Sequence, residues 1–325
     1  MSHAFAFHAY VTSVVFDKVG RALFALGDGT VRFEDGGTVQ AHDGAVLAAA
    51  PHPSGEGIVT GGDDGRVAWS QASGVAEIAS LPGKWVDAVA TSPASGLIAF
   101  AAGRDVHVRD VADPAFARAF AHERSVADLA FEPKGRRLAA ATYGGVWLWY
   151  ARIEAQKPGK LAWAGSHVSC IWSPDGRFLI SAMQENQLHG WRVADEKNMR
   201  MGGYPAKPKS LAFVAKGNLM ATSGANGVVV WPFAGATGPM GKQAAEVGYD
   251  EAALVTRVAA TPGLNWVAAG LDDGRVWACD LAGQKLVPLK AEKGSPITAL
   301  AMSADGKRVA WGDEDGAAGV AEITT

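Results

Sequence analysis

Hydrophobic residues recur in short groups, separated by turn residues, along nearly the whole chain. In one representative stretch, apolar positions within residues 126–131 are followed by a turn at residues 133–135. An apolar run at residues 138–141 then leads to a glycine pair at 144–145, and a third apolar group occupies residues 146–149. Hairpin signals at intervals of about eight to twelve residues are typical of short antiparallel strands. The stretch therefore predicts three consecutive strands.

The same pattern recurs throughout the sequence. Its template is an apolar residue, a second one three positions later, a third two positions after that, and usually a glycine four positions further on. The first positions of the copies are residues 11, 46, 86, 126, 167, 208, 255 and 297. The mean step is about 41 residues, within the period of 40–45 residues that four-stranded propeller blades show. We therefore expect an all-β, single closed β-propeller that spans residues 1–325 as one domain.

The second half of each copy supports the same fold. An apolar run leads to a tight turn rich in Asp, Asn and Gly, as at residues 27–29, 61–65, 224–227, 270–274 and 312–316. Asp-Gly and Asn-Gly pairs favour tight hairpins because these turns require positive φ angles. One sheet of four strands cannot bury both of its faces, whereas sheets that stack on one another can.

With these turns in place, the repeat resembles that of the WD40 family over almost the full chain. That family carries a His before the first strand of each blade, an Asp in the tight turn and a Trp-Asp pair at the end of the third strand. The matching positions are His42 and His122, then Asp28, Asp64, Asn186, Asn226, Asp273 and Asp315, then Trp149, Trp191 and Trp231, and finally Asp35, Asp110 and Asp280. No intact Trp-Asp dipeptide occurs, so no blade is expected to keep the complete set of hydrogen-bonding residues.

The two ends of the chain complement each other. Residues 4–11 alternate as a strand that has no blade of its own, while the last copy reaches Ile323 without a fourth strand. The N-terminal strand is therefore expected to close the last blade, as in WD40 proteins, and to remove an exposed edge. This arrangement predicts eight blades, rather than the seven that are commonest in the family.

Composition and charge exclude several kinds of protein. The net charge of −3 predicts no general attraction to nucleic acid or to acidic membranes. The two cysteines, Cys170 and Cys279, provide no disulfide framework and are expected to be buried. The N-terminus shows no signal-peptide pattern, and no run of about eighteen apolar residues occurs. We expect a cytoplasmic protein, and the Ala-rich and Gly-rich composition suggests a bacterial source.

No residue pattern predicts catalysis, a metal site or a bound cofactor. The histidines are spread over many copies without ligand spacing. His167 replaces an aliphatic residue of a first strand, and a structural role is expected for it. Acidic groups at residues 63–64, 272–273 and 313–315 resemble calcium ligands, but the chemistry of tight turns accounts for them. We therefore expect a protein that is not an enzyme.

The resemblance also indicates a docking surface. In WD40 proteins, the residues just before the first strand and the residue before the turn acid face the upper rim of the propeller. The corresponding positions here are Asp63, Lys84, Trp85, Arg124, Tyr143, Glu185, Lys207, Asp272 and Glu314. Trp, Tyr and Arg anchors are favoured at protein interfaces. The expected function is that of a non-catalytic scaffold, monomeric outside its complex, that docks a protein or peptide on this rim.

Two other functions remain open from the sequence. The first is a propeller enzyme, or a protein that binds a small ligand or metal in the central channel. Acids and histidines that converge at the mouth of the channel would distinguish it. The second is a fixed subunit of a larger assembly, which would co-purify with its partners in stoichiometric amounts.

Overall fold

The computed structural model describes residues 2–324, and nearly all of its regular structure is β-strand. A single short helix, η1 (Ala215–Gly217), lies among these residues, and none there is long and apolar enough to cross a membrane. By their contacts, the described residues divide into two compact units. We call residues 17–172 the middle unit. The terminal unit comprises the residues up to Phe16 together with those from Ser173 onward.

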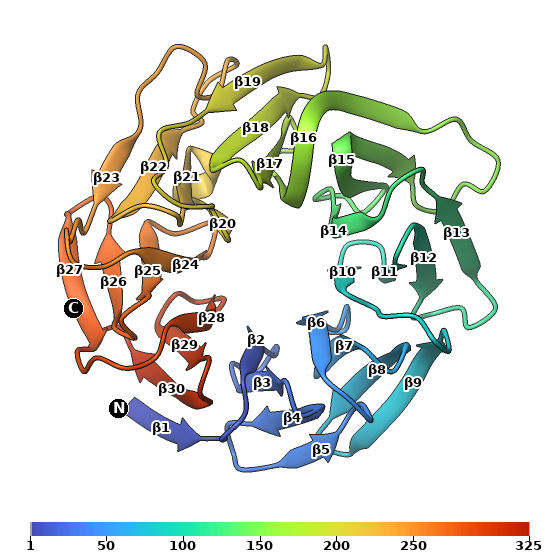
Figure 1. Ribbon diagram of the computed structural model, residues 1–325, viewed down its shortest axis with the longest axis horizontal. Coiled ribbons are helices and arrows are strands. Elements are labelled where there is room, and N and C mark those ends of the chain that lie inside the picture. Colours follow the sequence, from blue (N-terminus) through green and yellow to red (C-terminus); the bar gives the residue numbers. More distant parts are fainter. Residues whose placement is uncertain (1, 325) are drawn as a thin grey trace. The chain divides into compact units, whose positions relative to one another are not determined.

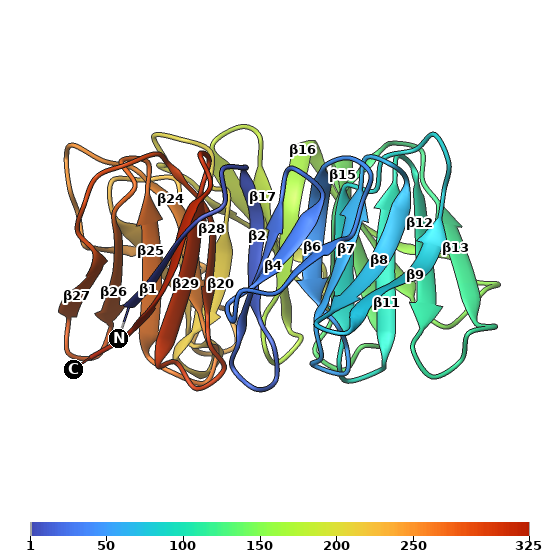
Figure 2. The same cartoon turned by 90° about the horizontal axis from the view of Figure 1, so that it is seen from below.

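The middle unit contains the strands from β3 to β16. They are β3 (Ala22–Leu26), β4 (Thr30–Phe33), β5 (Thr38–Gln40), β6 (Val46–Pro51), β7 (Ile58–Gly62), β8 (Arg66–Gln71), β9 (Gly74–Ser80), β10 (Ala88–Ser92), β11 (Leu97–Ala102), β12 (Asp105–Asp110), β13 (Ala117–Ala121), β14 (Val126–Phe131), β15 (Arg137–Tyr150) and β16 (Gly159–Trp172). Figure 1 shows β6 to β9 side by side in chain order, and Figure 2 shows their hairpins gathered at two opposite ends of the strands.

The terminal unit contains the remaining strands. They are β1 (Ser2–Ala6), β2 (Val11–Phe16), β17 (Phe178–Met183), β18 (Gln187–Arg192), β19 (Lys197–Met201), β20 (Leu211–Val214), β21 (Leu219–Thr222), β22 (Val228–Pro232), β23 (Ala245–Val247), β24 (Val255–Ala260), β25 (Trp266–Leu271), β26 (Val276–Asp280), β27 (Lys285–Lys290), β28 (Ile297–Met302), β29 (Arg308–Asp313) and β30 (Ala317–Glu322). Strands β2, β24 and β28 begin at the predicted residues 11, 255 and 297. In the middle unit, β6 and β14 likewise begin at residues 46 and 126.

The strands between residues 2 and 324 form seven sheets. Six sheets have four strands each, in the orders β2 to β5, β6 to β9, β10 to β13, β20 to β23, β24 to β27, and β1-β30-β29-β28. The seventh has six strands, β14 to β19. The predicted all-β class and the four-stranded blade are therefore confirmed.

The prediction of eight blades is wrong, because the repeats that start at residues 126 and 167 do not form separate sheets. Strands β15 and β16 are each 14 residues long and continue past the expected break between strands. Gly144 and Gly145 have φ angles of 84° and 140°, so the chain bends there with a shift in pairing register instead of ending the strand. Glycine tolerates such angles because it lacks a Cβ atom.

The N-terminal strand pairs with the C-terminal one. Strand β1 lies antiparallel to β30, from Ser2 opposite Ala321 to Ala6 opposite Ala317 (Figure 1). The strand expected at residues 4–11 thus occupies Ser2–Ala6, while Val11 begins β2. This pairing makes β1 the fourth strand of its sheet. The pairing involves β1 and β30 only, so the closure of a complete ring by this strand stays a prediction.

The second strand of most sheets forms the centre of the core. In β7, β11 and β17 every residue is buried, because both faces of these strands are covered. Packing between neighbouring sheets is correspondingly apolar. Leu97 and Phe120 of one sheet, for example, share a cluster with Leu138 of the next. Burial of large apolar side chains of this kind is the dominant favourable term in folding.

Glycines in the second strands allow adjacent sheets to approach closely. An added Cβ atom at Gly61 would lie 2.6 Å from Val86 Cγ1, and one at Gly312 would lie 2.3 Å from Val11 Cγ1. At Gly270 it would lie 2.4 Å from Ile297 Cγ2 and 2.7 Å from Ile297 Cβ. The partner is in each case a branched residue at the start of a first strand or, for Val86, two residues before it, so glycine and branched residue fit together as a pair.

Replacing Gly270 with alanine is expected to lower the free energy of unfolding by about 2 kcal/mol, because the new methyl group overpacks against Ile297. The matched control is Gly263→Ala. No atom lies within 4 Å of a Cβ atom there, and a small gain in stability is expected because alanine restricts the unfolded chain. Urea unfolding of both variants measures the difference. Equal stabilities would show that the close approach at Gly270 does not constrain the fold.

Candidate functional site

The acidic turn residues bond within the fold. The Oδ1 atom of Asp64 accepts the backbone N–H of Arg66 at 2.9 Å, and that of Asp313 accepts the backbone N–H groups of Asp315 and Ala317. Among residues 2–324, no group of three or more His, Cys, Asp or Glu side chains is placed to hold a metal ion. Turn chemistry thus accounts for these acids, as the sequence analysis expected.

One turn in the middle unit keeps part of the WD40 hydrogen-bond set. His42 Nδ1 lies 3.0 Å from Asp64 Oδ1, and His42 Nε2 lies 2.8 Å from Thr60 Oγ1. Burial opposes ionisation of Asp64. Hydrogen bonds from Arg66, His42 and Asp43 nevertheless hold its pKa below the ordinary value. Ser70 pairs with Ile58 of the neighbouring strand, and its buried Oγ atom has no hydrogen-bond partner among residues 2–324. The predicted incompleteness of the set is confirmed here.

A comparable network in the terminal unit was missed by the sequence analysis. Tyr204 donates its hydroxyl hydrogen to Thr222 Oγ1 at 2.7 Å and accepts the indole N–H of Trp231 at 2.7 Å. The Thr222 hydroxyl in turn donates to the carbonyl oxygen of Val229. Tyr204 precedes the repeat that starts at residue 208 by four positions, as His42 precedes residue 46. That spacing is the signal that could have identified Tyr204 as a substitute for the family histidine.

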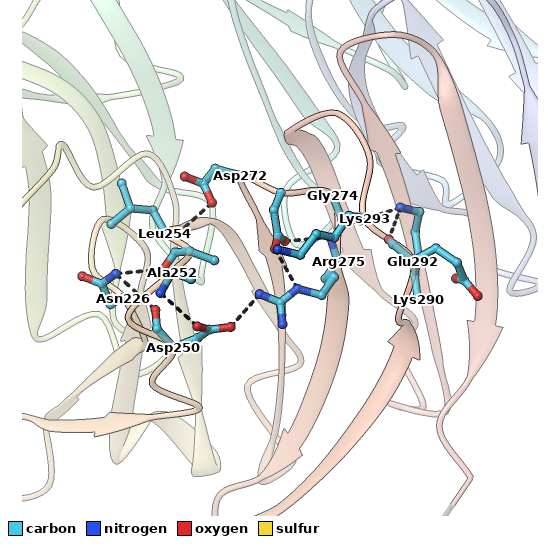
Figure 3. A network of polar contacts seen from close by, with 12 residues as sticks. Asn226, Asp250, Ala252, Leu254, Asp272, Gly274, Arg275, Lys290, Glu292 and Lys293 are labelled. Carbon is cyan, nitrogen blue, oxygen red and sulfur yellow. Dashed lines mark hydrogen bonds and ion pairs between the residues drawn. The ribbon is translucent and has the colours of Figure 1, made fainter.

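Figure 3 shows a polar network at the end of the sheet formed by β24 to β27. Arg275 lies between two carboxylates, with Nη2 at 2.6 Å from Asp250 Oδ2 and Nε at 2.8 Å from Asp273 Oδ2. The Oδ1 atom of Asp272 accepts the backbone N–H of Leu254 at 2.8 Å (Figure 3). Asn226 donates to backbone carbonyl oxygens of the loop that contains Asp250. The network fastens this loop to the turn between β21 and β22 and to the turn between β25 and β26, and Asp272 is part of it.

Of the other predicted rim residues of the terminal unit, two are exposed and one is partly buried, as Asp272 is. Glu185 and Glu314 are exposed in the hairpins β17–β18 and β29–β30. Lys207 is partly buried, and its Nζ donates to Gln184 Oε1 at 2.9 Å, which places it beside the hairpin that carries Glu185. Lys207 and Glu185 therefore lie close together.

In the middle unit, all five predicted rim residues lie at one end of neighbouring sheets. The backbone N–H of Val86 donates to Gly62 O at 3.0 Å, which places Trp85 beside the turn that carries Asp63. The backbone N–H of Val126 donates to Gly103 O at 2.8 Å. Val126 also pairs with Thr142, so Arg124 and Tyr143 lie at the same end. Together with the ion pair between Lys84 and Asp105, these bonds link the turns into one surface.

The aromatic residues of this surface are open to solvent. Trp85 is 67% exposed and Tyr143 is 61% exposed. Lys84 forms an ion pair with Asp105 at 3.0 Å, whereas Arg124 forms none with any residue between 2 and 324. Beside Trp85 lies a shallow hollow of ≈ 540 Å³. We call Asp63, Lys84, Trp85, Arg104, Arg124 and Tyr143 the docking surface.

Arg104 is the member of the docking surface that the sequence analysis missed. It lies in the hairpin between β11 and β12 and lines the hollow beside Trp85. Its backbone carbonyl accepts the N–H of His122 at 3.0 Å, so the hairpin is held against the segment that carries Arg124. The repeat template marks the turn acid of each copy, and this turn has none at the template position. For that reason no sequence signal pointed to Arg104.

His167 and the cysteines have structural roles. His167 is fully buried, and its Nε2 lies 3.1 Å from the carbonyl oxygen of Trp163. Cys170 and Cys279 are both buried. Burial raises the pKa of the Cys170 thiol well above its ordinary value, which keeps it protonated and unreactive. The expected burial of both cysteines is therefore confirmed.

Comparison with known families identifies the repeat. The family model described as "WD domain, G-beta repeat" matches residues 34–68 and 160–192. The first segment includes the His42, Thr60 and Asp64 network, and the second ends at Trp191 and Arg192, the positions of the family's Trp-Asp pair. Both matched segments thus resemble the WD40 repeat, and the resemblance seen in the sequence is confirmed. No curated protein matches the sequence.

Comparison with solved structures identifies the fold. The computationally designed protein Ika8 is 20% identical, with 98% of each chain covered and a TM-score of 0.78. The β-propeller domain of Cps50 (Swd1) from Myceliophteria thermophila is 14% identical, covering 86% of this chain and 96% of that one, with a TM-score of 0.68. A chain of a mitotic checkpoint complex is 18% identical, covering 99% and 94%, with a TM-score of 0.67. The fold is a β-propeller.

Proposed function

We propose that this chain is a non-catalytic scaffold that binds another protein through the docking surface of its middle unit. The observation that carries the proposal is the exposure of Trp85 and Tyr143 beside Arg124, which has no ion pair among residues 2–324. WD40 propellers are generally scaffolds that bind proteins, and a similar chain is part of a mitotic checkpoint complex. A propeller fold alone does not fix function, so the exposed side chains of the docking surface, and not the fold, support the proposal.

The chemistry of the docking surface suits a protein partner. Large, rigid aromatic side chains and arginine supply most of the binding energy at protein interfaces, at about 2 kcal/mol or more for each strong anchor. The hollow beside Trp85 offers a recess for one partner side chain. Lys84 is paired with Asp105, whereas the Arg104 and Arg124 guanidinium groups form no ion pair with described residues. The surface therefore favours a segment with an apolar residue next to an acidic one.

The terminal unit carries the rest of the proposed contact residues. Glu185, Lys207 and Glu314 are proposed as a second contact region, in which charges of both signs select the partner. Asp272 is assigned there as well, although its carboxylate also holds the backbone of Leu254. The proposal further includes a cytoplasmic location, a monomeric state outside the complex, and no binding of nucleic acid or membrane.

Capture from native cell extract tests the proposal. The tagged protein is isolated at moderate salt, and the proteins that co-purify with it are identified by mass spectrometry. One protein partner in stoichiometric amount is the expected result. Elemental analysis and denaturing extraction of the same sample detect a retained metal or small molecule. Retention of such a group without any protein partner would favour the ligand-binding or enzymatic function instead.

A further inference from the structure

A second hollow in the middle unit lies away from the docking surface. It encloses ≈ 510 Å³ between the sheets β6 to β9 and β10 to β13. Its lining includes His52 and Ser54, which follow the end of β6, and Val111 and Pro114, which follow the end of β12. Strands β6 and β12 start at the docking-surface end, so this hollow lies at the opposite end of both strands. Its volume is in the range of small-molecule sites.

The walls of the hollow are largely apolar. Trp69, Ile78 and Ile98 line it, together with Val111, which is 42% exposed. The His52 ring stacks on Trp69, with the ring centroids 4.0 Å apart and an angle of 10° between the planes. A flat, rigid wall of this kind favours a flat or apolar group through stacking and burial of apolar surface.

One cation in the hollow has no ion-pair partner among the residues that the structure describes. Glu77 pairs with Arg66 at 3.0 Å, and Asp110 pairs with Arg152 at 2.6 Å. Arg109 forms no ion pair with any residue between 2 and 324. Its guanidinium lies 5.6 Å from the centroid of the Phe100 ring, and Nη1 donates only to the carbonyl oxygen of Val108. Burial lowers the pKa of Arg109, but guanidinium groups remain charged in proteins.

His52 supplies a second donor. The Nδ1 atom of His52 accepts the backbone N–H of Ser54 at 3.3 Å and lies 2.8 Å from Ser54 Oγ. Ser54 Oγ itself accepts the backbone N–H of Glu56. The Ser54 hydroxyl hydrogen is thus directed to Nδ1, which fixes the neutral tautomer with its proton on Nε2. Burial lowers the pKa of His52 and favours this neutral form. The Nε2–H group makes no hydrogen bond to any described residue.

We propose that this hollow binds a small molecule that combines an apolar or aromatic ring with a single carboxylate. The carboxylate pairs with Arg109 and accepts the Nε2–H of His52, while the ring packs on Trp69 and the aliphatic wall. One uncompensated cation calls for one negative charge, and the guanidinium fork matches the geometry of a carboxylate. The inference does not depend on the docking surface, which lies at the other end of the strands.

The test uses 3-phenylpropionate as the probe and its neutral analogue 3-phenylpropionamide as the control ligand. Titration of the full chain, followed by ligand-observed NMR, should give binding of the acid that is at least about 10-fold tighter than that of the amide. Arg109→Gln should weaken binding of the acid at least about 10-fold and leave the amide unchanged. Arg104→Gln is the matched control, because Arg104 is exposed at the other end of the unit, and it should bind the acid normally.

A second variant keeps the test valid if Arg109→Gln fails to fold. Ala76 is exposed on β9, opposite Trp69, and lines the hollow, so Ala76→Trp should fill it and abolish binding while Arg109 stays intact. The proposal is overturned if the acid does not bind at about 10 mM, since a ligand of this size should be detected there. Equal affinity for acid and amide, or unchanged binding by Ala76→Trp, would overturn it as well.

Discussion

Replacing Tyr204 with alanine is expected to lower the free energy of unfolding by about 4 kcal/mol, and replacing it with phenylalanine by about 2 kcal/mol. The side chain is 8% exposed, so alanine leaves a large cavity in the terminal unit. Phenylalanine keeps the ring and removes only the hydroxyl. The difference between the two variants therefore separates packing from hydrogen bonding.

The cost of Tyr204→Phe arises from the groups that the hydroxyl satisfies. Without it, the Trp231 indole N–H loses its acceptor and Thr222 Oγ1 loses a donor. Thr222 is fully buried, and an unsatisfied buried polar group costs about 1–3 kcal/mol. Denaturant unfolding of both variants measures the effect. Equal losses of unfolding free energy in the phenylalanine and alanine variants would show that Tyr204 stabilises the fold through its hydrogen bonds and not through its ring.

The pH dependence of the free energy of unfolding provides an independent test of the Tyr204 network. Burial raises the pKa of Tyr204 to about 12, whereas hydrogen bonds with Thr222 and Trp231 favour the opposite direction. Because the pKa of Tyr204 is higher in the folded state than in the unfolded state, the folded state keeps the hydroxyl proton up to a higher pH. The resulting contribution to the free energy of unfolding is fully present below about pH 10. It is lost as the pH rises to about 12, with a total of about 3 kcal/mol. Wild type should lose more stability than Tyr204→Phe over this range, and parallel curves would contradict the assignment.

The double variant Trp85→Ala, Arg124→Ala is expected to weaken binding of the captured protein partner at least about 100-fold. Each residue is an exposed anchor of a type that contributes about 2 kcal/mol or more, and both lie at the same end of the middle unit. Because both side chains are exposed, thermal stability should stay unchanged. Titration of purified partner by calorimetry measures the affinity.

Tyr249→Ala is the matched control for this variant. Tyr249 is 64% exposed, close to the value for Trp85, but it belongs to the terminal unit and lies outside the docking surface. It should bind the partner with wild-type affinity. If the double variant binds normally, Trp85 and Arg124 are not part of the interface. If Tyr249→Ala weakens binding as strongly, exposure of aromatic residues in general explains the result.

The sequence was sufficient to predict the repeat and the type of sheet. Apolar spacing located the first strands at residues 11, 46, 126, 255 and 297, because period-two patterns and turn residues are local properties of the chain. It also predicted that Trp85 is exposed, since this residue precedes a first strand and lies outside the apolar pattern. The count of sheets could not be read in the same way. A glycine pair at 144–145 has the same sequence whether it ends a strand or bends it.

The charge balance of the hollow around Arg109 depends on contacts between side chains that no sequence pattern connects. The pairing of Glu77 and Asp110 with Arg66 and Arg152 decides that Arg109 is the uncompensated charge in its hollow. No spacing rule predicts these pairs. Tyr204 was missed for a different reason, because a tyrosine hydroxyl replaces an imidazole in a network that the family template describes only with histidine. Chemical equivalence at a template position is therefore more informative than residue identity.

Hydrogen–deuterium exchange on the complex between this protein and its captured partner tests the central claim most directly. Binding of the partner is expected to slow exchange in five segments of the middle unit: residues 61–65, 84–87, 103–105, 123–125 and 143–145. These segments carry the docking surface and are linked by backbone hydrogen bonds. Unchanged exchange there, together with slower exchange confined to other segments of the chain, would contradict the account and place the interface elsewhere.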